Sequence, residues 1–210
     1  MDALEPLYGR PLNTPSYDPL SELVLTILSQ NTADRNSGKA FVQLLTRFAD
    51  WAAVASASEA DVVEAIRVGG LAQQKAPRIQ SALRGVAERT GGEFHLDFLS
   101  SLDVEGARDW LRSLPGVGPK TAACVLLFAL GLPAMPVDTH VERVSKRLGL
   151  VPAGMTAEKA HVELERIVAP DDYYRFHMLL IKHGRRLCAA RNPECGACPL
   201  RARCPASLAR

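Results

Sequence analysis

Apolar side chains recur at helical spacing along most of this 210-residue chain, and no segment shows the strict alternation of a half-buried strand. The clearest apolar stripes are Leu20, Leu23, Val24, Ile27 and Leu28, followed by Phe41, Leu44, Leu45 and Phe48. Glycine or proline ends each run after a few turns, so we expect about nine or ten short helices with short connections. The sequence therefore predicts an all-α fold.

Residues suited to helix starts stand where several of these stripes begin. Pro19 fits the first turn of a helix, and Ser58 with Asp61 resembles a capping box. Asp138 precedes a further apolar stripe, so a helix N-cap is its first expected role.

The composition is that of an ordinary globular protein, with 47% hydrophobic and 23% charged residues, which excludes collagen-like, low-complexity and disordered chains. The first residues lack the basic and apolar regions of a signal peptide, and the most apolar stretch, 122–132, is too short to cross a bilayer. We therefore expect a cytoplasmic protein without membrane association, in which structural disulfides are unfavourable.

The formal net charge of +2 hides an uneven distribution. From residue 182 to 210 the chain carries seven basic residues and one acidic residue, which leaves the preceding part at −4. A basic tail suggests a polyanionic partner, although a solvated surface gives the same pattern.

Four cysteines near the C-terminal end impose a second constraint. Cys188, Cys195, Cys198 and Cys204 are spaced C-x6-C-x2-C-x5-C. Four thiolates can hold either zinc or a [4Fe-4S] cluster. Structural zinc usually takes two close cysteine pairs, whereas only Cys195 and Cys198 are close here, so the spacing favours the cluster. The fifth cysteine, Cys124, lies in an apolar segment and is expected to be a small buried hydrophobe.

The segment Leu114–Ala122, with the sequence LPGVGPKTA, joins an amphipathic helix to an apolar one. A turn containing Gly116 and Gly118 would present free backbone N–H groups at a helix N-terminus, where they can bind a phosphate without reading base sequence. Pro119 suits the first helical position. Taken alone, the segment could equally be a plain tight turn between two helices.

Lys120 falls in the first turn of the second helix, where the positive end of the helix dipole disfavours the ammonium form. The chain contains 19 Arg and 6 Lys, and an Arg would serve a simple phosphate contact equally well. An amine that must lose its proton and attack carbon has to be lysine, because guanidinium stays charged. The residue choice suggests a nucleophile, with a solvated surface charge as the alternative.

Three segments together resemble the endonuclease III family of helix–hairpin–helix DNA glycosylases. They are Leu114–Ala122, Val137–Val144 and the cysteine set Cys188–Cys204, in that order. The segments 27–34 (ILSQNTAD) and 70–75 (GLAQQK) match the family more loosely. The resemblance covers nearly the whole chain, and the combination is far more specific than any one segment.

The resemblance implies a two-lobed fold. One lobe is a six-helix domain over residues 21–131 that bears the hairpin, and the other combines residues 1–20 and 132–210 and holds the [4Fe-4S] cluster. DNA would lie across the cleft between the lobes, with Lys120 contributed by one lobe and Asp138 by the other.

The resemblance also implies the chemistry of a bifunctional base-excision glycosylase and abasic-site lyase. Such an enzyme flips an oxidised pyrimidine out of duplex DNA. Lys120 would attack the sugar C1′, form a Schiff base and cut the strand by β-elimination, while Asp138 assists the lysine and stabilises positive charge on the sugar. The expected partner is duplex DNA with damaged pyrimidines or abasic sites, bound by a monomer at the nucleoid.

DNA-binding residues follow from the same resemblance. Leu71 would be the apolar wedge that enters the base stack, and Asn31 stands where the family has the glutamine that fills the gap left by the flipped base. Pro119 stands where some members have arginine, which removes a phosphate-facing charge. The full expected set is Gly116, Gly118, Thr121, Asn31, Leu71, His140, Arg191 and Arg201.

Two alternatives stay open at the level of sequence. Adenine glycosylases of the same superfamily lack the hairpin lysine and carry a glutamate close to the position of Thr26 here. A non-catalytic iron–sulfur protein that uses the hairpin only as a phosphate clamp is the alternative from another functional class.

Overall fold

The computed structural model describes residues 1–15 and 17–208, and within these residues it contains helices and no strand, which confirms the predicted all-α class. The helices are α1 (Glu5–Tyr8), α2 (Pro19–Ser29), α3 (Asp34–Arg47), α4 (Trp51–Ser56), α5 (Glu59–Ile66), α6 (Ala72–Arg89), α7 (Val104–Arg112), α8 (Pro119–Cys124), α9 (Thr139–Arg147), α10 (Ala157–Ile167), α11 (Tyr173–Arg186) and α12 (Pro205–Leu208). Short 3-10 segments are η1 (Arg67–Gly69), η2 (Asp97–Ser101), η4 (Pro170–Asp172), η5 (Cys195–Ala197) and η6 (Arg201–Arg203), and η3 (Val125–Ala129) is a π-helical segment.

The chain divides into two compact units. The hairpin unit is Pro15–Leu132, and the cysteine unit combines Met1–Thr14 with Pro133–Arg210. Among the described helices, none combines the length and the apolar character needed to cross a membrane.

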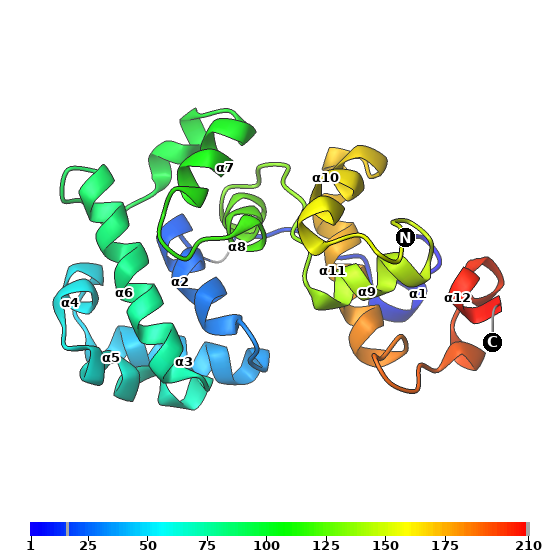
Figure 1. Cartoon of the computed structure of the whole chain (residues 1–210), viewed down its shortest axis with the longest axis horizontal. Coiled ribbons are helices and arrows are strands. Elements are labelled where there is room, and N and C mark those ends of the chain that lie inside the picture. Colours follow the sequence, from blue (N-terminus) through cyan, green and yellow to red (C-terminus); the bar gives the residue numbers. More distant parts are fainter. Residues whose placement is uncertain (16, 209–210) are drawn as a thin grey trace. The chain divides into compact units, whose positions relative to one another are not determined.

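Helix α2 is central to the hairpin unit, where it packs against α3, α6, α8 and η3 (Figure 1). Its apolar stripe is buried as predicted, each member being 1% exposed or less: Leu20, Leu23, Val24, Ile27 and Leu28. The stripe predicted for α3 is only partly confirmed, because Phe48 is half-buried and lies just beyond the end of the helix. Phe41 and Leu44 are buried there, but Leu45 is 48% exposed because it turns to the solvent side of the helix.

Local capping chemistry accounts for the helix starts. Pro19 occupies the first turn of α2, and Ser58 caps α5 by accepting a hydrogen bond from the Asp61 amide at 3.1 Å, both as predicted. Asp18 is an N-cap that the sequence reading missed, with Oδ1 accepting from the amides of Leu20 and Ser21. These caps satisfy amide groups that a helix N-terminus leaves open.

The apolar segment after the hairpin does not form the single α-helix that its periodicity suggests. Helix α8 ends at Cys124, and the chain continues as the wider π-helical turn η3. Cys124 itself is 3% exposed, which confirms its expected burial.

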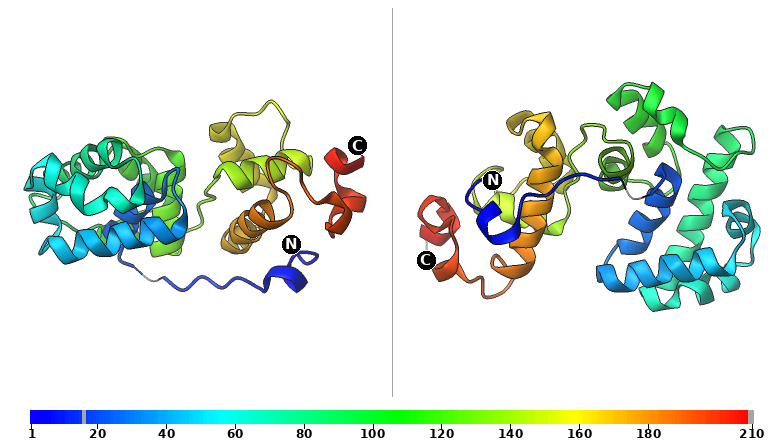
Figure 2. Two further views of the ribbon diagram at one scale, coloured as in Figure 1. Left: turned by 90° about the horizontal axis from the view of Figure 1, so that it is seen from below. Right: turned by 180° about the vertical axis from the view of Figure 1, so that it is seen from behind.

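The cysteine unit is organised around the pair α9 and α11. Gly184 on α11 allows their close approach, because a Cβ there would lie 3.0 Å from the His140 Cβ and from Arg143 Nη2. Helix α1 lies beside α11, and Figure 2 shows this pairing from behind. Arg175 on α11 joins them by donating to Glu5 Oε1 at 2.5 Å and to Asp2 Oδ1 at 2.6 Å.

Candidate active-site residues and metal centre

The hairpin between α7 and α8 is seated on α6 by its apolar residues. Leu114 and Val117 are buried, and the Val117 amide donates to the Leu114 carbonyl at 3.2 Å. Gly116 has φ +76°, a left-handed conformation that strongly favours glycine. On α6, a Cβ at Gly85 would lie 2.9 Å from Pro115 Cδ, so the absence of a side chain at Gly85 lets the hairpin approach the helix.

The N-terminus of α8 carries the candidate nucleophile. Gly118 is the N-cap and offers no side-chain cap, Pro119 is the first helical residue as predicted, and Lys120 follows it. Apart from the adjoining residues in the chain, no described atom lies within 4 Å of a Cβ placed on Gly118, so this end of the helix is open. Thr121 is buried, and its Oγ1 accepts a hydrogen bond of 3.4 Å from Gln30 Nε2, which links α8 to the end of α2.

A carboxyl group that the sequence reading missed accompanies Lys120 in the hairpin unit. Glu22 on α2 accepts a hydrogen bond of 3.0 Å from Thr26 Oγ1. Burial raises the pKa of Glu22 to about 7, against the opposing effects of the Thr26 hydrogen bond and the positive charge of Lys120. The sequence does signal the Glu22–Thr26 pair, because residues four apart on a helix are neighbours. The burial of the Glu22 carboxyl group could not be predicted from that spacing.

Asp138 is the N-cap of α9, as predicted. Its Oδ1 accepts from the amides of His140 at 2.9 Å and Val141 at 2.7 Å. Within the described chain, no hydrogen bond is formed by Oδ2. The cap therefore holds one carboxylate oxygen in place and leaves the other for solvent or a ligand.

Buried polar contacts fix the backbone that leads to Asp138. The Nδ1 atoms of His161 and His177 lie 2.6 and 2.7 Å from the carbonyl oxygens of Met135 and Pro136. In addition, Glu165 Oε1 accepts from the Met135 amide at 2.8 Å. Since these partners come from α10 and α11, the position of the cap depends on the packing of the cysteine unit.

The other predicted site residues are distributed over both units. Asn31 and Leu71 are exposed in the hairpin unit, and each has φ +52°. In the cysteine unit, His140 Nδ1 lies 3.0 Å from Arg143 Nη2, while Arg191 and Arg201 are exposed. Lys120 belongs to the hairpin unit and Asp138 to the cysteine unit.

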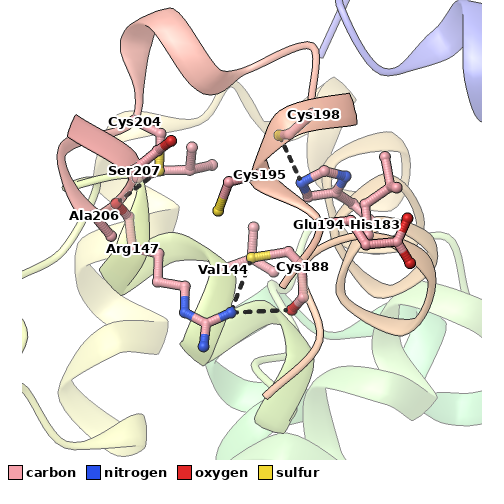
Figure 3. A pocket seen from close by; sticks show the side chains of 12 residues that line it. Val144, Arg147, His183, Cys188, Glu194, Cys195, Cys198, Cys204, Ala206 and Ser207 are labelled. Carbon is pink, nitrogen blue, oxygen red and sulfur yellow. Dashed lines mark hydrogen bonds between the residues drawn. The ribbon is translucent and has the colours of Figure 1, made fainter. Parts of the chain in front are cut away.

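The four cysteines of the C-terminal segment line one pocket, with His183 beside them (Figure 3). Arg147 contacts Cys188 twice: its Nη1 donates to the Cys188 carbonyl and lies 3.3 Å from the Cys188 Sγ. Cys204 Sγ donates to the Arg147 carbonyl at 3.3 Å. Cys198 Sγ lies 3.6 Å from His183 Nε2.

These residues fit a [4Fe-4S] cluster by the chemistry of the donor set. Across residues 1–15 and 17–208, no three His, Cys, Asp or Glu side chains are grouped to share one metal ion. A cubane cluster takes one thiolate at each of its four iron corners, and this segment offers four thiols. Burial raises the pKa of the Cys198 thiol, and the neighbouring Cys188, Cys204 and Cys195 raise it further. A cationic cluster would compensate such a gathering of thiolates.

Comparison with known proteins agrees with this arrangement. Residues 24–170 match the model of the HhH-GPD superfamily base excision DNA repair proteins. A candidate DNA glycosylase of Arabidopsis thaliana is 39% identical over 166 residues, which cover 79% of this chain and 56% of the plant protein. The chain thus spans little more than half of that relative. Endonuclease III of Thermotoga maritima is 35% identical over 194 residues, covering 92% of this chain and 86% of the relative.

Solved structures agree along the whole length of the chain. A non-covalent endonuclease III–DNA complex matches with a TM-score of 0.84 at 30% identity, covering 100% of this chain and 94% of that protein. A trapped covalent endonuclease III–DNA intermediate matches with a TM-score of 0.85, also at 30% identity and with the same coverage. The chain therefore belongs to the HhH-GPD superfamily of base excision DNA repair proteins and, within it, to the endonuclease III family of DNA glycosylases.

Proposed function

We propose that this protein is a bifunctional glycosylase and abasic-site lyase that removes oxidised pyrimidines from duplex DNA. The observation that carries the proposal is Lys120, a lysine in the open first turn of α8, directly after the hairpin. The similarity to an endonuclease III trapped in a covalent DNA intermediate supports a covalent step. A lysine at this place can supply the nitrogen for such a bond.

The proposed reaction begins with the neutral Nζ of Lys120 forming a bond to C1′ of the flipped nucleotide. The bond between C1′ and the base breaks, and the base leaves with the bonding electrons and takes up a proton. Nζ then loses one proton, its lone pair forms the C1′=N bond as the C1′–O4′ bond breaks, and O4′ takes up a proton, which leaves a protonated Schiff base. Loss of a proton from C2′ expels the 3′ phosphate and cuts the strand, and water releases the sugar from Lys120.

Asp138 is proposed to assist this chemistry as a carboxylate held by its own helix cap. The amides of His140 and Val141 hold Oδ1, so Oδ2 is the atom available to accept a proton or to stabilise positive charge on the sugar. The cap role and the catalytic role are compatible, because a fixed carboxylate loses little freedom on reaction.

Cys188, Cys195, Cys198 and Cys204 are proposed to hold a [4Fe-4S] cluster. When bound, the cluster supplies four iron–thiolate bonds that organise the loop from Cys188 to Cys204. This loop carries Arg191 and Arg201, which are exposed and can contact phosphates.

The remaining proposed DNA contacts lie on the hairpin and on two exposed turns. The backbone amides around Gly116, Gly118 and Thr121 would bind phosphate, and His140 would add a contact from α9. Asn31 and Leu71 would enter the base stack beside the flipped nucleotide. The proposed partner is duplex DNA with damaged pyrimidines or abasic sites, bound by an intracellular, nucleoid-associated monomer.

Borohydride trapping on a duplex with one 5-hydroxycytosine or one abasic site tests the proposal. The wild type should form a covalent adduct and cut strands, Lys120→Gln should form none, and Lys39→Gln, an exposed lysine on α3, should behave as wild type. Tight binding by the wild type with neither adduct nor base release would make the protein a non-catalytic DNA-binding module.

A monofunctional glycosylase is the second candidate, because Glu22 supplies a half-buried carboxyl group on α2 close enough to Lys120 for their charges to interact. A carboxylate there could activate water in place of the lysine. Base release that persists in Lys120→Gln but is lost in Glu22→Gln would favour this candidate. Loss of base release in Lys120→Gln supports the bifunctional enzyme.

A further inference from the structure

Lys75, in the first turns of α6, is an almost completely buried lysine, with 2% of its surface exposed. Its Nζ donates three hydrogen bonds, to the Leu28 carbonyl at 2.5 Å, to Thr32 Oγ1 at 2.5 Å and to the Gly69 carbonyl at 3.1 Å. A lysine ammonium has three N–H donors, so all of them are used inside the protein. Lys75 is therefore not available to contact a phosphate.

The three acceptors of Lys75 belong to two turns that are far apart in the sequence. Leu28 and Thr32 flank the turn after α2, whereas Gly69 ends η1 just before α6. Thr32 also bridges the turns directly, since its Oγ1 lies 2.6 Å from the Gly69 carbonyl. Lys75 and Thr32 thus tie both turns together at one point.

Each of these turns presents one exposed residue in a left-handed backbone conformation. Asn31 has φ +52° in the first turn, and Leu71 has φ +52° and ψ +31° in the second. Leu71 is 45% exposed although it is apolar. A left-handed conformation is unusual for leucine and is maintained only where the surrounding structure imposes it.

The second turn packs closely against helix α3. A Cβ on Gly69 would lie 2.9 Å from the Ala40 Cβ on α3, so the backbone of Gly69 is pressed against that helix. Gly70 follows with φ +66°, and a Cβ there would be 4.0 Å from Thr32 Oγ1. The contacts of Lys75 therefore hold the first turn to an already anchored second turn.

We propose that Lys75 is a positioning residue that fixes Asn31 and Leu71 as one rigid two-residue wedge for the DNA base stack. The inference rests on the proposed function, because it assumes that these two residues enter the stack. It adds a buried cation that never touches DNA and acts only through the two turns. Lysine suits this role because a single nitrogen must reach three acceptors at once.

A duplex with 2-aminopurine opposite a tetrahydrofuran abasic analogue tests the inference, because 2-aminopurine fluorescence rises when its stacking is disturbed. The fluorescence rise is measured at saturating protein, per bound complex, for wild type, Lys75→Met and the matched variant Lys39→Met. We expect Lys75→Met to reduce the rise roughly fivefold, the factor for losing restraint of about 1 kcal/mol on one strained residue. Lys39→Met should match the wild type.

The salt dependence of binding separates positioning from phosphate contact. Lys75→Met should keep the wild-type slope of the logarithm of the binding constant against the logarithm of salt concentration, because Lys75 neutralises no phosphate. A full fluorescence rise in Lys75→Met, or a smaller salt slope, would overturn the inference. A merely structural defect would lower the fraction of folded protein and the apparent affinity without changing the rise per bound complex.

Two further variants keep the test decisive. If Lys75→Met does not fold, Thr32→Val, which removes the bridging hydroxyl, should reduce the rise while Thr32→Ser retains it, and equal rises would contradict the inference. Leu71→Ala separates the two hypotheses. A full rise in Leu71→Ala would contradict the wedge role in the proposed function, whereas a loss there with a full rise in Lys75→Met would contradict only the role of Lys75.

Discussion

Thr26 donates a hydrogen bond of 3.0 Å from Oγ1 to Oε1 of Glu22, one helical turn earlier on α2. The pair places a carboxyl group in the same unit as Lys120, near the position where related adenine glycosylases are expected to carry a glutamate. Position 26 of this chain is a threonine, so a comparison of that position alone does not reveal the carboxyl group of Glu22 one turn earlier. The structure thus identifies Glu22 as a carboxyl group whose role can be tested by substitution.

Glu22 should make stability depend on pH. Its pKa is raised from 4.5 to about 7 in the folded protein, so the folded state favours the protonated form. The favourable contribution is complete below pH 4.5 and is lost as pH rises through 7. Glu22→Gln removes the cost of holding an ionised Glu22 in the folded protein. At high pH its free energy of unfolding should exceed that of the wild type by up to about 3 kcal/mol.

Urea unfolding at about pH 5.5 and about pH 8.5 measures the Glu22 effect. The advantage of Glu22→Gln over the wild type should grow with pH, whereas Glu88→Gln, whose side chain is 80% exposed, should show no such trend. A constant difference between Glu22→Gln and wild type would show that Glu22 titrates normally.

Asp138→Asn should reduce turnover roughly 100-fold with little loss of DNA affinity. Asparagine can still accept the amide hydrogen bonds of the cap, so the helix start is retained while the carboxylate charge is lost. Single-turnover rates and equilibrium binding on the same lesion duplex check this. Equal losses of rate and affinity would indicate that Asp138 is only a cap.

Gly85→Ala should displace the hairpin. The new Cβ would lie 2.9 Å from Pro115 Cδ, and the resulting crowding of about 1–3 kcal/mol outweighs the usual helical gain from alanine. DNA affinity should fall together with the free energy of unfolding. Gly38→Ala on α3 is the control, because its Cβ meets nothing within 4 Å and should stabilise the protein by about 0.5–1 kcal/mol.

The proposed cluster predicts brown protein with about four iron and four sulfide per chain. Cys195→Ser should lose most of the iron and the visible absorption, whereas Cys124→Ala should keep both, since Cys124 is buried in α8 outside the pocket. Metal analysis of both variants provides the measurement. Colourless wild-type protein containing zinc would contradict the cluster.

Arg201, in the loop from Cys188 to Cys204, is expected to bind a DNA phosphate. Arg201→Gln should weaken binding to all duplexes alike and reduce the salt slope by about one. Arg166→Gln, which removes a surface arginine paired with Glu163, serves as the control. An unchanged slope in Arg201→Gln would exclude this residue from the DNA contact.

The sequence by itself determined the local architecture. Apolar periodicity identified the buried stripe of α2, and short-range polar chemistry identified Ser58 and Asp138 as caps. The hairpin residues and the cysteine set also carried the family resemblance that the comparisons confirmed. Such features depend on residues only a few positions apart, so they can be read along the chain.

Only the tertiary structure decided which polar groups are buried and what they meet. Glu22 and Lys75 have the sequence character of surface residues, yet helix packing half-buries Glu22 and encloses Lys75. The acceptors of Lys75 come from segments up to 47 positions away. Burial and long-range hydrogen bonding depend on which helices pack together, and no local pattern in the sequence records that choice.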